Sequence, residues 1–191
     1  MLWESQSFAS MGGEKKFRLQ LDAGYSSQQF DGVSGANFSR LSQYTYGVGF
    51  FYRHKMWESG LRYSVVPNVN ISPFTFLNGV IGSYHINFSR YDFLTGIFSW
   101  PYHFLIVYGI EQAAWTGSPD LGQSLKSDSH YGILVSYDIS EGAGSKFKFP
   151  ISIEYLFNPQ RTYTFANYPN DGVTTTAGSE YILKAGAALE F

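Results

Sequence analysis

The strongest constraint on the fold is a two-residue period that recurs along nearly the whole chain. Residues 16–25 read KFRLQLDAGY, with mostly large apolar side chains at odd positions and charged, polar or small ones at even positions. The same alternation returns in residues 44–53, 57–65, 104–112, 131–139, 147–157 and 181–191. Successive side chains of a β-strand point to opposite faces, so this period predicts strands. No segment combines a 3.6-residue apolar stripe with helix caps, and the chain is therefore predicted to be all-β.

The residues on the second face of these strands indicate whether the apolar face packs in a protein core or contacts lipid. A soluble barrel turns its second face to water and fills it with Lys, Glu, Thr and Gln. Here that face is mostly glycine, alanine and serine, with scattered charges of both signs. Small residues and paired ions suit a narrow interior, while lipid can receive the large apolar side chains. The pattern favours a transmembrane antiparallel up-and-down β-barrel over a soluble β-barrel or sandwich.

Composition excludes several other classes of protein. Aromatic residues make up 19% of the chain and charged residues only 15%, so the chain is not of the disordered type. Its 191 residues fit one domain, and the absence of cysteine excludes disulfides and thiolate chemistry. A net charge of -2 without a basic patch gives no support for nucleic-acid binding. No transmembrane helix or signal peptide is recognisable, so we expect a mature chain whose signal peptide is absent.

The connections between the predicted strands alternate in length. Long polar stretches occupy residues 26–40, 116–129 and 158–179, and short joins occupy 53–55, 100–102 and 140–145. Long loops on one rim and short turns on the other are typical of outer-membrane barrels. We expect an N-terminal periplasmic extension over residues 1–15 and a barrel over residues 16–191.

The number of strands depends on how residues 66–102 are interpreted. Turn signals at Pro67-Asn68, Asn78-Gly79 and Ser89-Arg90 predict separate strands near 69–77, 80–88 and 91–100, and ten strands in all. The apolar phase must then slip near Pro73, as a bulge would allow. A β excursion within residues 67–90 would instead leave eight, which suits a compact barrel of this length. Turn chemistry favours ten, and eight stays open.

The pattern over residues 16–191 and the last strand together resemble the small bacterial outer-membrane barrels of the OmpA, OmpX and OmpW type. That group ends in a strand of alternating apolar residues with a final Phe, matched here by Tyr181, Leu183, Leu189 and Phe191. The resemblance implies a bacterial outer-membrane location, recognition of this strand by the barrel-assembly machinery, and contact with outer-membrane lipids and lipopolysaccharide. Aromatic residues near strand ends fit the membrane interfaces: Tyr44, Trp57, Trp100 and Tyr102.

If the apolar face meets lipid, ten charges are predicted to point into the lumen. They are Lys16, Arg18, Asp22, Glu58, Arg62, Glu111, Asp138, Lys148, Glu154 and Lys184. Five of each sign can form an ion-paired plug that stiffens the barrel, or a gate along a narrow ion path. The plug is the favoured interpretation.

A catalytic site would need a nucleophile, a base and an orienting group in one place. His85 follows Ser83 by two residues, and His130 follows Asp128 and Ser129. Some outer-membrane barrels are lipid A deacylases or acyltransferases, but no characteristic motif accompanies these residues. We expect no catalytic residue, metal or cofactor. The predicted function is structural, or surface recognition through the long loops, with a narrow pore for ions or small apolar solutes and a lipid-modifying enzyme as alternatives.

Overall fold

The structure is a computed structural model that describes residues 15–30, 33–34, 40–75, 81–118, 126–158, 161–165, 168–175 and 178–191. The predicted extension lies outside the described residues, apart from Lys15, which begins the first strand. Among the described residues there is no helix long and apolar enough to cross a membrane.

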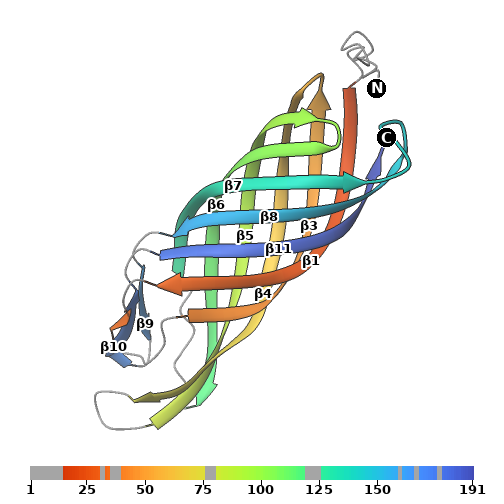
Figure 1. Ribbon diagram of the computed structural model, residues 1–191. Coiled ribbons are helices and arrows are strands. Elements are labelled where there is room, and N and C mark those ends of the chain that lie inside the picture. The colour runs from red at the N-terminus through yellow and green to blue at the C-terminus, as the bar shows by residue number, and fades with distance from the viewer. Residues whose placement is uncertain are drawn as a thin grey trace, which may run out of the picture.

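Eight strands close into an antiparallel barrel (Figure 1). The strands are β1 (Lys15–Phe30), β2 (Val33–Ser34), β3 (Arg40–His54), β4 (Trp57–Thr75), β5 (Ile81–Ser99), β6 (Tyr102–Ser118), β7 (Lys126–Ile139), β8 (Phe147–Asn158), β9 (Arg161–Phe165), β10 (Tyr168–Thr175) and β11 (Gly178–Glu190). Around the barrel they follow the order β1-β11-β8-β7-β6-β5-β4-β3, while β2, β10 and β9 form a separate sheet. The predicted all-β up-and-down barrel is confirmed.

The barrel closes between its first and last strands. The Phe17 amide donates to the Phe191 carbonyl and the Phe191 amide to the Phe17 carbonyl, each at 2.9 Å. Three tight turns lie on this same rim, at residues 55–56, 100–101 and 140–146, as the short joins predicted. We call it the short-turn rim. The opposite end, the loop rim, is the end from which β4, β5 and β6 extend and beside which the small sheet lies (Figure 1).

The preference for ten strands is wrong, because β4 and β5 are single strands of 19 residues each. Ser89 and Arg90, interpreted as a turn, pair with Val65 and Ser64 in the middle of the β4–β5 ladder. The register instead shifts between Val66 and Val69 and between Ile71 and Phe74, so the slip expected near Pro73 is confirmed. A bulge tolerates a proline because the extra residue there has no ladder hydrogen bond to donate.

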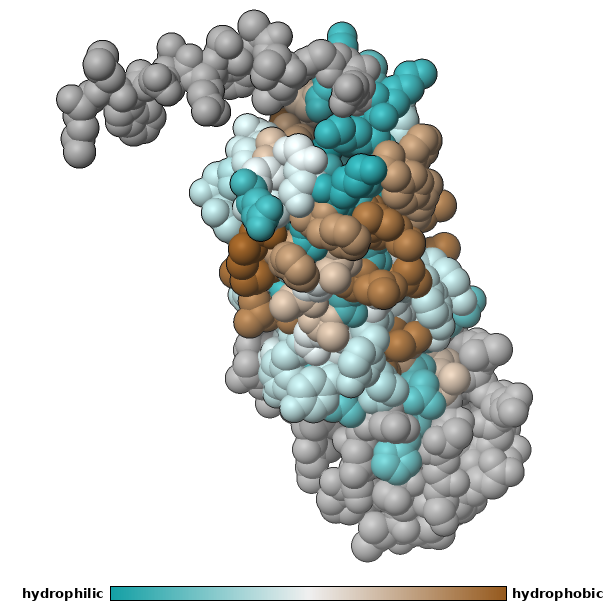
Figure 2. Space-filling view, turned by 90° about the vertical axis from the view of Figure 1, so that its right-hand side faces the viewer, coloured by the Kyte–Doolittle hydropathy of each residue, from teal (hydrophilic) through white to brown (hydrophobic). Residues whose placement is uncertain are grey.

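An apolar band surrounds the outside of the barrel. On the face shown in Figure 2 brown side chains form a band across the middle of the barrel, and teal side chains gather toward the short-turn rim. Each barrel strand contributes at least one tyrosine on the loop-rim side of the band, among them those at positions 25, 44, 63, 91, 108, 131, 155 and 181. From Tyr25 to Phe17 β1 covers eight residues, or about 20 Å of height at ~3.3 Å per residue and a tilt of ~40°. This height is close to that of a membrane-crossing apolar band, about 25 Å.

Candidate functional site in the barrel interior

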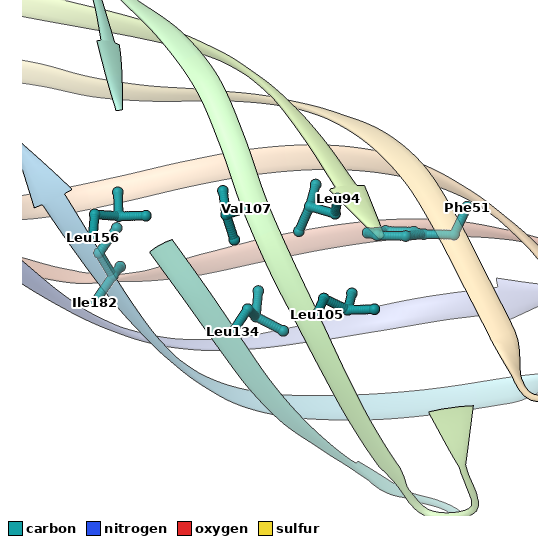
Figure 3. Packing of buried hydrophobic residues seen from close by; sticks show 7 residues of the cluster. All are labelled: Phe51, Leu94, Leu105, Val107, Leu134, Leu156 and Ile182. Carbon is teal, nitrogen blue, oxygen red and sulfur yellow. The ribbon is translucent and has the colours of Figure 1, made fainter. Parts of the chain in front are cut away.

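Buried apolar side chains from six of the eight barrel strands form a cluster inside the barrel, which we call the apolar ridge. Its members come from β3, β5, β6, β7, β8 and β11 (Figure 3): Phe51, Leu94, Leu105, Val107, Leu134, Leu156 and Ile182. Two glycines make room for the largest of them. A Cβ added to Gly49 would lie 2.6 Å from the Phe51 ring, and one added to Gly60 would also collide with that ring.

Charged side chains fill the short-turn end of the interior. Arg53 donates to Glu190 at 2.9 Å and lies over the Phe98 ring, 3.9 Å from its centroid. Lys148 donates to two backbone carbonyl oxygens of the β7–β8 turn, at 2.8 and 3.1 Å. Its Nζ also lies 4.1 Å from the centre of the Trp100 ring. These contacts tie the turn to the barrel wall.

The next level is the Arg18 cluster, made of Arg18, Glu58, His103 and Asp138. Arg18 forms a two-pronged pair with Asp138, with N–H···O distances of 2.7 and 2.9 Å. His103 contacts Glu58 through Nδ1, while its Nε2 lies 2.9 Å from Asp138. All four side chains are buried. The Nε2 atom of His103 also lies 3.1 Å from Arg18 Nη1, so the imidazole ring contacts every other member of the cluster.

The middle of the barrel holds the Arg62 cluster. Arg62 donates to Asp92 at 2.9 and 2.6 Å and to Glu154 at 2.5 Å. His130 Nε2 lies 2.7 Å from the other oxygen of Asp92. Lys184 Nζ lies 3.3 Å from Glu154. Asp22 completes the cluster, 3.8 Å from the same lysine.

Toward the loop rim lies the Arg90 cluster, made of Ser26, Arg90, Glu111 and Glu180. Arg90 Nε donates to Glu111 at 2.5 Å, and its two terminal nitrogens donate to Glu180 at 2.8 and 2.7 Å. Ser26 donates to the same glutamate. The guanidinium thus uses its fork to hold carboxylates from two strands, β6 and β11.

Two of these ion pairs span the full width of the lumen. Arg62 on β4 reaches Glu154 on β8, and Arg90 on β5 reaches Glu180 on β11. In both cases the strands are four places apart around an eight-stranded barrel, so they face each other across its axis. The hollow beside the Arg18 cluster and the Phe51 ring holds about 10 Å³. That is the space of about one water molecule.

The Arg18 cluster and the Arg62 cluster each combine carboxylates with an equal number of basic side chains. In the Arg18 cluster two carboxylates face one arginine and one histidine. In the Arg62 cluster three carboxylates face one arginine, one lysine and one histidine. Unpaired charge is costly in a dry interior, and in both clusters each carboxylate lies beside a basic side chain.

Comparisons with known proteins bear on the fold. No protein-family model matches the sequence, and no curated protein does either. The structure of Neisserial surface protein A (NspA) matches with a TM-score of 0.52 at 11% identity, over 92% of this chain and 97% of that one. The outer membrane protein OprG from Pseudomonas aeruginosa matches with a TM-score of 0.54 at 11% identity, over 94% and 98%. The chain has the fold of the small bacterial outer-membrane β-barrels.

Within this outer-membrane-type barrel, the eight residues expected to form a lumen network all point inward and are buried. They are Arg18, Asp22, Glu58, Arg62, Glu111, Asp138, Glu154 and Lys184. Lys148 is buried as well, whereas Lys16 is half-buried at the rim. Sequence reasoning missed several members: Arg53, Arg90, Asp92, His103, Glu180 and Glu190. Arg90 and Asp92 share the parity of the inward Phe88 and Leu94, so one unbroken alternation through 86–98 would have found them.

The terminal-strand residues and interface aromatics lie mostly on the outside of the outer-membrane-type barrel. Tyr181, Leu183, Leu189 and Phe191 are exposed on one face of β11 and just beyond it. Tyr44 is exposed on the loop-rim side, and Trp57 and Tyr102 are exposed near the short-turn rim. Trp100 differs, because its ring contacts the buried Lys148.

The two candidate catalytic histidines lie on different faces of the barrel wall. His85 is exposed, and the Ser83 side chain lies outside the described ones. His130 points inward to Asp92, while Ser129 is on the opposite, exposed face of β7. Across the described residues, no group of three or more His, Asp or Glu side chains is arranged to hold a metal ion.

Proposed function

We propose that the protein is an integral outer-membrane β-barrel with a filled lumen, without enzymatic activity, whose role is structural or surface recognition. The apolar band and its tyrosine ring support the membrane placement, since such bands meet lipid and such rings lie at interfaces. The short-turn rim then faces the periplasm and the loop rim faces the outside of the cell.

The observation that carries the filled lumen is the pair of ion contacts across the barrel axis. A side chain from one wall that bonds a carboxylate on the opposite wall closes the passage at that level. The Arg62 and Arg90 clusters do this at two levels, and the apolar ridge packs beside them. This favours a plug over a narrow pore for ions or small apolar solutes.

Surface recognition would then rest with the loop rim. The predicted loops 26–40, 116–129 and 158–179 are only partly covered by the described residues and side chains. Their described backbone includes the β2–β10–β9 sheet, which lies beside the loop rim (Figure 1). A rigid barrel that presents ordered segments outside the membrane is a common arrangement for binding.

Single-channel recording in planar lipid bilayers tests the plug. The wild-type protein, shown to be inserted by its heat-modifiable gel mobility, is expected to give no steady current. The double variant Arg62→Met/Arg90→Met, which removes both contacts across the axis, provides the positive arm, because both closed levels are then opened to water and ions. A stable ohmic conductance of the wild type would contradict the plug and support the pore.

A further inference from the structure

A second feature lies on the short-turn rim, outside the interior clusters. A hollow of about 280 Å³ opens where β1 begins, β11 ends and the β7–β8 turn passes. Its lining includes Lys15, Lys16, Ser145, Lys146, Glu190 and Phe191. None of these residues takes part in the contacts across the barrel axis.

The hollow has an excess of positive charge. Lys15 and Lys146 are exposed and Lys16 is half-buried, so the three ammonium groups are available to a ligand. The Glu190 carboxylate is buried and already paired with Arg53 at 2.9 Å.

Apolar rings adjoin this positive hollow on the membrane side. Phe147 is 66% exposed and Phe191 is 62% exposed. Phe17 stacks on Phe191 with ring centroids 6.2 Å apart. A ligand that fits both parts must have an anionic head and an apolar tail. These rings end the apolar band, which is the depth at which lipid headgroups lie.

We propose that this hollow binds the phosphate headgroup of an anionic glycerophospholipid in the leaflet on the short-turn side. The proposal rests on the membrane placement proposed above. Lys16 and Lys146 hold the phosphate from β1 and from the β7–β8 turn, and the acyl chains lie along Phe147 and Phe191. Lysine suits this task because its ammonium is a compact charge on a flexible stem.

Native mass spectrometry of the full chain in nanodiscs of phosphatidylcholine, with phosphatidylglycerol added in steps, measures the binding. The wild type is expected to retain phosphatidylglycerol in preference to phosphatidylcholine. A lysine near a membrane surface contributes about fivefold to the binding of an anionic lipid. The double variant Lys16→Gln/Lys146→Gln should therefore bind phosphatidylglycerol about 25-fold more weakly.

Two matched variants separate this site from general surface charge. Lys55→Gln removes an exposed lysine of the same rim that does not line the hollow, and is expected to change the affinity less than about twofold. Lys16→Arg/Lys146→Arg keeps the charge and should keep the preference. Equal losses in Lys55→Gln and in Lys16→Gln, or no loss in the double variant, would overturn the proposal.

The same samples keep this inference apart from the proposed membrane placement. If the wild type inserts, shows heat-modifiable mobility and yet holds both lipids equally, the lipid site is refuted and the membrane placement stands. If the chain stays in solution without detergent or lipid, the membrane placement is refuted first and the lipid site with it.

Discussion

Replacing Arg62 with methionine tests the closed interior most directly. The substitution keeps a long, unbranched side chain but removes the guanidinium that bonds Asp92 on the neighbouring strand and Glu154 across the lumen. The Arg62 side chain is only 2% exposed, so the ion pairs that it forms are buried. Removing one partner of a buried ion pair costs about 3–5 kcal/mol, because the other charge is left uncompensated.

The remaining contacts place the expected cost at the lower end of that range. Asp92 keeps His130 at 2.7 Å, and Glu154 keeps Lys184 at 3.3 Å. We therefore expect Arg62→Met to lower the free energy of unfolding by about 3 kcal/mol. In a wide, water-filled lumen the same pair would contribute at most about 1 kcal/mol. The size of the loss thus distinguishes a dry plug from a wet channel.

Urea unfolding of the protein in phosphatidylcholine vesicles, followed by tryptophan fluorescence, measures this loss. Lys55→Met, at the exposed β3–β4 turn, is the matched control and should change the free energy by less than about 0.5 kcal/mol. Adding Glu154→Gln to Arg62→Met should recover part of the loss, since one uncompensated carboxylate is then neutral. A loss below about 1 kcal/mol for Arg62→Met would refute the reasoning.

Four further outcomes are expected, the first three in the same unfolding assay and the last in gel mobility. His103→Leu leaves two carboxylates facing one arginine and should cost about 2–3 kcal/mol, with partial recovery when Glu58→Gln is added. Gly109→Ala places a methyl group 2.7 Å from a histidine ring nitrogen of the Arg62 cluster and should cost about 1–3 kcal/mol. Gly144→Ala, with open space around its Cβ, is the control and should be near neutral. Lys55→Gly relieves a left-handed backbone with φ of 56° and should stabilise the turn by about 0.5–1 kcal/mol. Deleting the β9–β10 hairpin should leave heat-modifiable mobility intact, because that sheet is separate from the barrel.

The barrel could be predicted because its two faces differ so strongly along most strands. The strand number was harder, since turn residues and lumen residues share a chemistry. Ser89 and Arg90 are polar neighbours, which in a soluble protein suggest a turn, yet here Arg90 points into the Arg90 cluster. In a barrel with a polar interior, a polar residue in the middle of a segment is expected at every second position.

The inward direction of many charges could be predicted, but their partners could not. Arg18 and Asp138 are 120 residues apart, and Arg62 and Glu154 are 92 apart. Which charges meet depends on strand number and on the stagger between neighbouring strands. His130 shows the consequence. Its sequence neighbours suggested a serine partner, while the fold gives it Asp92 from another strand.

The polar interior also bears on how the chain finds its register. An ion-paired core is often no more stable than an apolar one of the same volume, so stability alone does not explain these clusters. A strand that slips by one residue exchanges its two faces. For β4 that slip would turn Arg62 to lipid, at a cost of about 2–4 kcal/mol near the membrane centre, and Leu61 into the ion network. An all-apolar interior would remove this cost, because either face of the strand would then suit lipid. We therefore infer that the buried charges specify which face of each strand is the inside.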